Sequence, residues 1–318
     1  MIRTPLYRQT PPAIFPVTLG FLGLGNAWIN AASMIGFPVA VGQLLTGLAT
    51  LFYVFFATSY ILKFAVRPSV LHDDLTTAPN RAGLAALTIS LMVLSLALQS
   101  LGILVAPILW VGVIGYIIVM ILVARELRSD PPEARQFSPF QYLSFVALIV
   151  AAIPAFGFGY RMVSLGFALL SLVAFAIVTI GWGAKLIRVR PPLPLRPSVV
   201  MILAPLSLFA ITFWLLGMTM LAVIFYAIAT IIFLMFCALS VWLTKGGWTP
   251  VWGAFTFPIA AFANLQVMAV SKGIGPIATV GLFASLAIGT PLILYIAYKH
   301  TMAWSRGDLS KKSGAAVA

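Results

Sequence analysis

Long apolar stretches, separated by short connections that carry basic residues, fill almost the whole sequence. An α-helix needs about 20 apolar residues to cross the hydrocarbon core of a membrane. Such stretches occur over residues 14–32, 36–62, 83–103, 106–124, 139–157, 161–184, 198–215, 218–243, 251–270 and 275–298. They lack the period-two alternation of a membrane β-barrel. We therefore predict an all-α integral membrane protein with ten transmembrane helices.

The composition supports a surface that faces lipid. Only 8% of the residues are charged and 62% are hydrophobic, whereas a soluble domain has about 25% charged residues. A chain with so few charges has to satisfy its backbone hydrogen bonds internally, as membrane helices do. The formal net charge of +13 would suggest nucleic-acid binding in a soluble protein. Here the basic residues lie between the apolar stretches, so they report on topology.

The basic residues lie almost entirely on one side of the predicted membrane. All but two of the 19 Lys and Arg residues fall in the terminal segments, in the connections 63–82, 125–138 and 185–197, or at Lys245. The exceptions are Arg161 and Lys272. The positive-inside rule then places both termini in the cytoplasm. We expect a single ten-span domain, residues 1–318, in a bacterial inner membrane, folded as the helical hairpins 14–62, 83–124, 139–184, 198–243 and 251–298.

The ionisable side chains avoid the predicted spans. All six acidic residues, His72 and His300 lie in segments predicted to be cytoplasmic, and the single cysteine, Cys237, cannot form a metal site alone. Intramembrane charge normally marks a proton relay or a cation site. The pattern therefore argues against a proton pump and a membrane metalloenzyme, and we predict neither a cofactor nor nucleic-acid binding.

Helix-breaking prolines favour the odd-numbered spans. An interior proline removes a backbone hydrogen bond and kinks its helix, and in a membrane the freed carbonyl must face protein or a wet cavity. The prolines that fall inside the first, fifth, seventh and ninth spans are Pro16, Pro154, Pro205 and Pro258. The third span has none. We expect the odd helices to lie inside and the even helices to face lipid.

Side-chain amides show the same preference. Asn26 lies in the first span, Gln99 in the third and Asn264 in the ninth. Amides in membranes commonly join helices by hydrogen bonds, and that interpretation stays open beside the alternative, a polar but uncharged pore lining.

Two motifs resemble the tellurite-resistance/dicarboxylate transporter family, which includes bacterial tellurite-resistance proteins and the plant guard-cell slow anion channels. The first is Phe15-Pro16 followed by Gly20, Gly23 and Gly25. The second is the sequence WGAFTFP at residues 252–258, which is similar to the family's W-x-x-x-S-F-P stretch with Thr256 in place of serine. The family often has a His-Pro element before the third span, whereas this sequence has His72 and no adjacent proline.

The resemblance implies a quasi-fivefold pore with an inner ring of odd helices and an outer ring of even helices. It also implies a homotrimer in which each subunit has its own pore, closed by the phenylalanine that matches Phe257. Thr256 would then be a further candidate for the pore lining. Without the resemblance, Phe257 would be interpreted as one packed aromatic residue among 23 phenylalanines.

Three functions are compatible with these observations. The first is a channel or channel-like transporter for small inorganic or organic anions, in which a pore without fixed charge binds ions weakly and releases them fast. The second is a proton-coupled secondary transporter that exports dicarboxylates or oxyanions such as tellurite. The third is a membrane enzyme or assembly factor, which the lack of a catalytic constellation at membrane depth disfavours. The missing membrane carboxylates favour the first.

Overall fold

Helices form all the regular structure of the residues that the computed structural model describes, 5–129 and 137–318. The first four residues and part of the predicted 125–138 connection lie outside this range. The long helices are α1 (Phe15–Ile35), α2 (Val39–Val66), α4 (Ala78–Ser100), α5 (Ala106–Ser129), α8 (Arg161–Arg188), α9 (Leu203–Leu215), α10 (Thr219–Ala238), α12 (Gly253–Ser271) and α13 (Pro276–Ser305). Short 3-10 helices precede three of them: η2 (Pro12–Ile14), η3 (Leu193–Ile202) and η4 (Pro250–Trp252). The remaining elements are η1 (Leu6–Gln9), α3 (Val70–Leu75), α6 (Gln141–Phe145), α7 (Leu148–Gly157), α11 (Ser240–Thr244) and α14 (Asp308–Ser313).

Nine helical stretches of the described chain are long and apolar enough to cross a membrane, and α7 is a shorter apolar helix. They coincide with the ten predicted spans. The fifth span, however, is divided into α6 and α7. The Tyr116 hydroxyl of α5 accepts a hydrogen bond from the Ala147 N–H at 3.1 Å, between the two helices. This bond satisfies a backbone donor that the interruption would otherwise leave unpaired in an apolar environment.

Burial separates the spans into two groups, as the prolines and amides predicted. In the odd-numbered spans built on α1, α4, α9 and α12, between 67 and 89% of the most apolar 18-residue window is buried inside the protein. In α2, α5, α8, α10 and α13 the corresponding share is 22–33%. Residues 148–155 of α7 are also buried. The odd spans therefore form the core, and the even spans expose the apolar side chains that a bilayer would cover.

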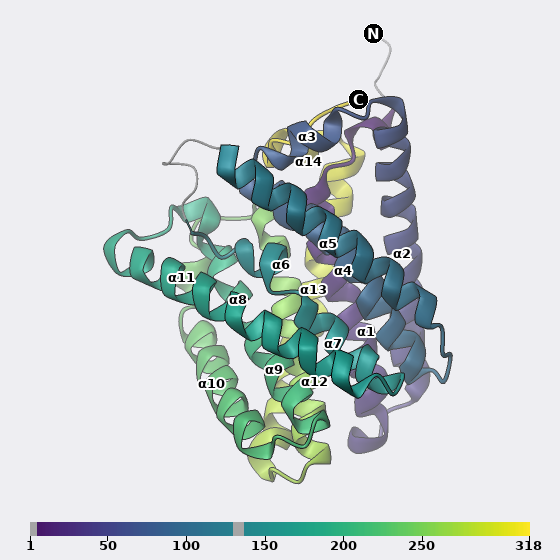
Figure 1. Cartoon of the computed structure of the whole chain (residues 1–318), viewed down its shortest axis with the longest axis vertical. Helices are drawn as coiled ribbons and strands as arrows, with labels where there is room; N and C mark the ends of the chain where they lie inside the picture. The colour runs from purple at the N-terminus through teal and green to yellow at the C-terminus, as the bar shows by residue number, and fades with distance from the viewer. Residues whose placement is uncertain (1–4, 130–136) are drawn as a thin grey trace.

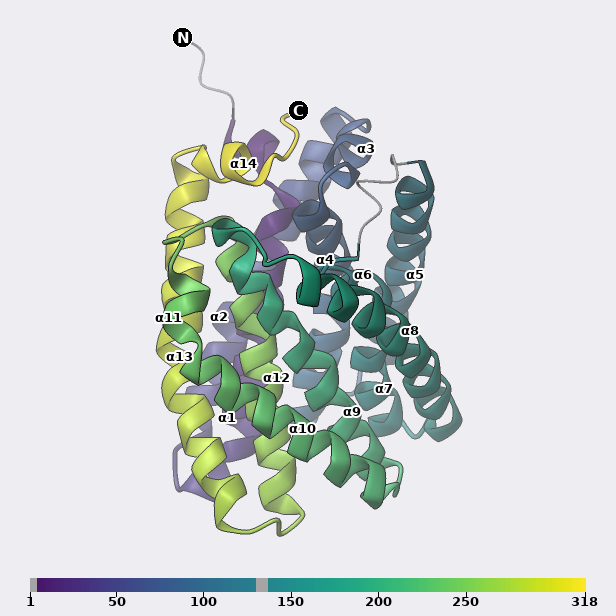
Figure 2. The same ribbon diagram turned by 90° about the vertical axis from the view of Figure 1, so that its left-hand side faces the viewer.

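The inner helices contact one another in a closed ring. Helix α1 packs on α4, α4 on α7, α7 on α9, α9 on α12, and α12 again on α1. Each outer helix packs on the inner helix before it, so the five predicted hairpins are present; Figure 2 shows α10 crossing in front of α9 and α12. A quasi-fivefold symmetry of this ring stays a prediction.

Helices α1 and α12 approach each other closely at Gly20. A Cβ atom added at Gly20 would lie 2.3 Å from the Cβ of Thr256, so only glycine fits there. Small residues allow membrane helices to approach closely and gain van der Waals contact. Gly20 therefore fixes the spacing between the first and the ninth span.

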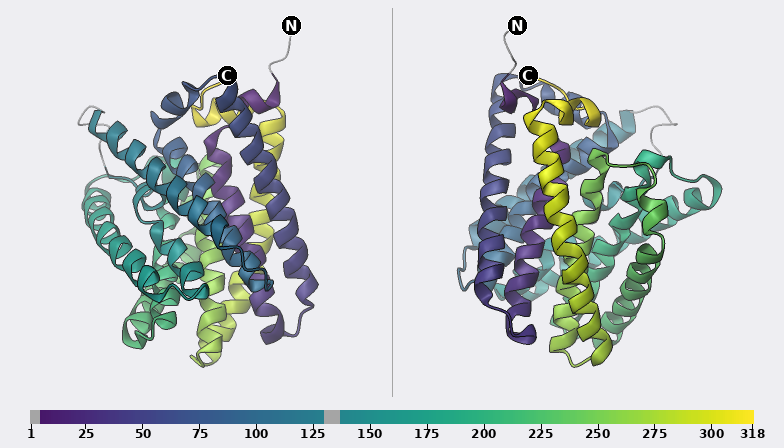
Figure 3. Two further views of the ribbon diagram at one scale, coloured as in Figure 1. Left: turned by 45° about the vertical axis from the view of Figure 1, so that its right-hand side comes forward. Right: turned by 180° about the vertical axis from the view of Figure 1, so that it is seen from behind.

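Both described ends of the chain lie at the same end of the bundle, together with α3 and α14 (Figure 1). We call this end the terminal side and the opposite end the far side. Helix α13 runs along the bundle from the far side to α14 (Figure 3, right). The inner helices α1, α9 and α12 all begin toward the terminal side and end toward the far side.

Candidate pore

Three consecutive cavities occupy the centre of the helical ring. The terminal-side cavity has a volume of about 400 Å³, the central cavity about 30 Å³ and the far-side cavity about 400 Å³. The terminal-side and central cavities share the lining residues Pro16, Met201, Gly253 and Ala254. The central and far-side cavities share Val150, Leu208 and Phe257. The cavities therefore follow one another along a path that narrows in its middle.

The central cavity is almost entirely apolar. It is lined by Pro16 and Pro205, from the first and seventh predicted spans, and by the adjacent Phe257 and Pro258 of the ninth. Tyr142 is the lining residue with a side-chain hydroxyl, and that group is hydrogen-bonded to Thr179 of α8 at 3.0 Å. A volume of about 30 Å³ could hold roughly one or two waters, but a water needs polar partners to stay there. The narrowest part of the path is therefore a dry constriction.

Helix geometry changes at the level of this constriction. The transitions η2 to α1, η3 to α9 and η4 to α12, and the interruption between α6 and α7, all occur beside residues that line the central cavity. Pro16 and Pro205 lie in the first turn of their α-helices, not in the interior as predicted, because a 3-10 segment occupies the start of each span. Pro154 and Pro258 are inside α7 and α12.

Phe257 lies at the boundary between the central and far-side cavities and is 6% exposed. Its ring rests against α1 at Gly23, where an added Cβ atom would come within 3.8 Å of the phenyl Cδ2. Phe255 is equally buried but packs edge-on against Trp252, with the ring centroids 5.7 Å apart. The two neighbouring phenylalanines of the motif therefore have different environments.

A network of side-chain amides lines the far-side cavity. Asn26 Nδ2 donates to Asn264 Oδ1 at 2.7 Å, and the Ser100 hydroxyl donates to Asn26 Oδ1 at 2.8 Å. Asn264 Nδ2 also donates to the Gly23 carbonyl at 2.9 Å, and Gln99 Nε2 donates to the Pro154 carbonyl at 3.0 Å. The amides join α1, α4, α7 and α12 by hydrogen bonds, and they also line a cavity. Their role as the lining of a pore stays a prediction.

Thr256 lies away from this path. It is fully buried between α1 and α12, and its hydroxyl bonds to the carbonyls of Pro16 and Gly253, each at 2.7 Å. The predicted lining role does not fit this position, because a residue next to Phe257 on a helix points about 100° away from it. Arg161, one of the two basic residues predicted on the side away from the termini, donates to the Leu216 carbonyl just beyond α9 at 2.9 Å.

The terminal-side cavity contains the charge nearest to the path. Among the described residues that line the three cavities, Lys312 is the only one with a charged side chain. Its ammonium lies 5.4 Å from the centre of the Trp248 ring, which lines the same cavity. Sequence reasoning counted Lys312 as one of many basic residues of the C-terminal segment. It had no signal for this position, or for Val150, Met201 and Leu208 at the constriction, because these contacts join distant parts of the chain.

A comparison with protein families gives one match that covers most of the chain. The family model for voltage-dependent anion channels matches residues 9–299, from the end of η1 into α13. No curated protein is significantly similar to the chain. The matched region contains the whole inner ring, Phe257 and the amide network, and it ends before α14.

Proposed function

Because the chain belongs to the voltage-dependent anion channel family, we propose that it passes small inorganic or organic anions along the three consecutive cavities and that Phe257 is the gate. The observation that carries this proposal is the position of Phe257, which lines both the constriction and the far-side cavity. A phenyl ring in a narrow apolar passage blocks it sterically and keeps it dry.

The helix ends support a preference for anions. The helical stretches Pro12–Ile35, Leu193–Leu215 and Pro250–Ser271, which start with η2, η3 and η4, begin beside the terminal-side cavity, and α7 begins beside the central cavity. A helix N-terminus carries a partial positive charge of about half an elementary charge. Such ends favour an anion on its way to the constriction without binding it as firmly as a buried lysine or arginine would, so the ion can leave quickly.

The amide network supports a second, weaker interaction on the far side. Asn26, Gln99 and Asn264 present polar but uncharged groups to a cavity of about 400 Å³. Such groups can exchange hydrogen bonds with a partly hydrated anion at small net cost. In this proposal the terminal side is cytoplasmic, as the distribution of basic residues indicates. The protein would lie in a bacterial inner membrane as a homotrimer with one pore per subunit.

The gate is tested by comparing Phe257→Ala with Phe255→Ala in liposomes loaded with chloride, nitrate or malate. Phe257→Ala removes the ring between two cavities, so we expect anion flux at least several-fold above that of the unmodified protein. Phe255→Ala is the matched control, because it deletes the same ring from the contact with Trp252 and leaves the constriction intact.

Three results would contradict the proposal. Conduction by Phe255→Ala with a closed Phe257→Ala would place the gate on the other ring. Cation-selective conduction by Phe257→Ala would reject the anion pathway. Slow, saturable transport by the unmodified protein, with no conduction by either variant, would favour an alternating-access carrier.

A further inference from the structure

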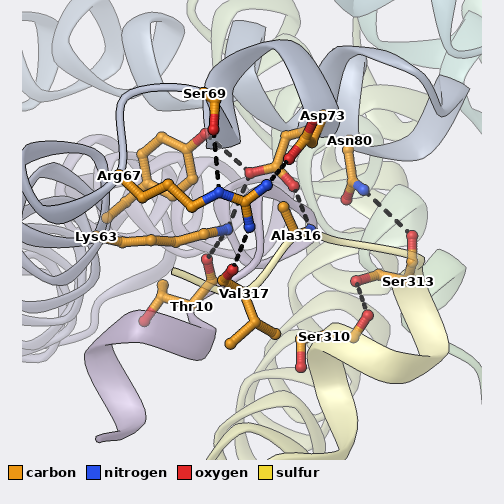
Figure 4. A network of polar contacts seen from close by, with 12 residues as sticks. Thr10, Lys63, Arg67, Ser69, Asp73, Asn80, Ser310, Ser313, Ala316 and Val317 are labelled. Atoms are coloured by element: carbon orange, nitrogen blue, oxygen red, sulfur yellow. Dashed lines mark hydrogen bonds and ion pairs between the residues drawn. The ribbon is translucent and has the colours of Figure 1, made fainter. Parts of the chain in front are cut away.

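The C-terminal segment is fastened to the terminal side by a set of polar contacts that we call the C-terminal clasp: Arg67, Asp74 and Asn80, which bond to the backbone of residues 313–317, and Lys63, which pairs with Asp74. Figure 4 shows Lys63, Arg67 and Asn80 beside Ser313, Ala316 and Val317. At its centre, Lys63 and Asp74 form an ion pair at 2.9 Å, and neither side chain is exposed to solvent. The second carboxylate oxygen of Asp74 accepts the N–H of Ala316 at 2.8 Å. The sequence had placed both charges in a cytoplasmic connection; folding buries them under the C-terminal segment.

Further contacts of the clasp extend to both sides of Ala316. Arg67 Nη1 donates to the Val317 carbonyl at 2.7 Å, and Asn80 Nδ2 donates to the Ser313 carbonyl at 3.2 Å. Asn80 is fully buried in the first turn of α4. Since Ser313 is the last residue of α14, these bonds hold α14 at a fixed position on the inner ring.

The fixed position of α14 puts a charge at the entrance to the path. Lys312 and Ser313 of α14 line the terminal-side cavity, beside Trp248, Thr249 and Gly253. Within the described residues Lys312 pairs with no carboxylate, and Lys299 adds a second ammonium 5.4 Å from the Trp248 ring. Lys312 is exposed, so its ammonium lies at the open mouth of this cavity. An unpaired positive charge at the mouth of a cleft with low-dielectric walls raises the local concentration of anions.

We propose that α14 is an anion-recruiting element: the C-terminal clasp holds Lys312 at the terminal-side cavity, where its ammonium concentrates small monovalent anions before they enter the constriction. Helix α14 with Lys312 lies outside the region that matches the anion-channel family, whereas the rest of the cavity wall, including Trp248, lies inside it. The proposal deepens the function proposed above and rests on it for its consequence in conduction. Anion binding at the cavity itself can be measured without any conduction.

The direct test uses iodide, an anion that quenches indole fluorescence on contact, with the full chain in lipid nanodiscs. The Trp248 signal is the difference between the protein and its Trp248→Phe variant. Lys312→Gln should lower the quenching constant of that signal by roughly twofold to fivefold at low salt. At about 1 M of a non-quenching salt the effect should disappear, because the Debye length is then near 3 Å. The control is Lys311→Gln, which removes the same charge one residue away, from a side chain that is also exposed but does not line the cavity.

The clasp is tested separately by Ala316→Pro, which deletes the N–H that Asp74 accepts but leaves the Lys63–Asp74 pair and Lys312 in place. This variant should lose as much Trp248 quenching as Lys312→Gln. In a Phe257→Ala background, both variants should reduce the anion current that enters from the terminal side more than the current from the far side.

Equal quenching constants for Lys312→Gln and Lys311→Gln would overturn the recruiting role of Lys312, and full quenching in Ala316→Pro would overturn the role of the clasp. A Phe257→Ala protein that carries no anion current would instead reject the proposed channel function. The quenching constants would then still test whether Lys312 concentrates anions at the terminal-side cavity.

Discussion

Removing Asp74 should destabilise the protein far more than a typical substitution on the terminal side. Asp74→Ala deletes the partner of a Lys63 ammonium that has no solvent exposure, and leaves that ammonium with the Thr10 carbonyl at 3.1 Å. It also removes the acceptor of the Tyr60 hydroxyl at 3.0 Å and of the Ala316 N–H. Breaking a buried ion pair from one side costs about 3–5 kcal/mol, because the other charge stays buried without compensation. We expect a loss of this size in the free energy of unfolding.

The reciprocal change, removal of Lys63, should lower the free energy of unfolding by less than removal of Asp74. Lys63→Met leaves the Asp74 carboxylate with two donors, the Tyr60 hydroxyl and the Ala316 N–H, and a hydrogen bond to a charged group contributes about 1.5–3 kcal/mol. The double variant Lys63→Met/Asp74→Ala has no buried charge at all, and apolar replacement of a buried pair is often close to neutral. Its loss should therefore be several kcal/mol smaller than the sum of the two single losses.

The measurement is a double-mutant cycle from reversible unfolding in mixed detergent micelles, followed by tryptophan fluorescence. Asp73→Asn is the comparison for an exposed pair, since Arg67 and Asp73 form an ion pair with side chains 45 and 39% exposed and this change leaves the Arg67 bond to Val317 in place; such pairs contribute at most about 1 kcal/mol. A loss below about 1 kcal/mol for Asp74→Ala, or additive single losses, would refute the reasoning, because either result means that water or a rearranged partner compensates Lys63.

Three further predictions address packing, coupling and orientation. Gly20→Ala should lower the free energy of unfolding by about 1–3 kcal/mol or more, since its Cβ would overlap Thr256. In the control Gly47→Ala the new Cβ meets no atom within 4 Å, so that change should be neutral or stabilising. Similar losses for both variants in the same unfolding assay would contradict the tight α1–α12 contact. Anion flux should not be coupled to protons, because the described residues that line the central and far-side cavities carry no ionisable acid or imidazole; a reversal potential that follows a pH gradient at symmetric anion concentration would contradict this. A reporter fused after Ala318 should be active only if it functions in the cytoplasm, and strong alkaline phosphatase activity there would overturn the proposed orientation.

The arrangement of inner and outer helices could be predicted from the sequence because the bilayer imposes it. Unsatisfied carbonyls and amides are unfavourable against lipid, so interior prolines and amides are concentrated in the helices that other helices surround. Asn26, Gln99 and Asn264 line the far-side cavity for this reason. Gln43 of α2 and Pro291 of α13 are exceptions on outer helices. The same constraint made the span boundaries visible, since charge is expelled to the connections.

Local patterns could not predict the features that depend on contacts between distant segments. The break between α6 and α7 is satisfied by Tyr116, about thirty residues earlier in the chain. The polar contacts that bury Asp74 with Lys63 include the N–H of Ala316, although the sequence places Lys63 and Asp74 in an ordinary polar connection, residues 63–82. Thr256 shares a motif with Phe257, but the rotation of the helix sends its hydroxyl to the Pro16 carbonyl.

A fast, selective pore has to select anions and also release them quickly, and the distribution of charge along the path assigns these two requirements to different places. A fixed charge at the constriction would select anions but would also hold them, because Coulomb energies grow steeply as the dielectric constant falls. The described lining of the constriction and the far-side cavity has no such charge, and the helix N-termini near the path contribute only partial charges. Lys312 lies instead in a cavity of about 400 Å³, where an anion can keep part of its hydration and still be concentrated. Selection at the mouth and weak binding at the constriction can therefore be varied independently, and Lys312→Gln and Phe257→Ala change them one at a time.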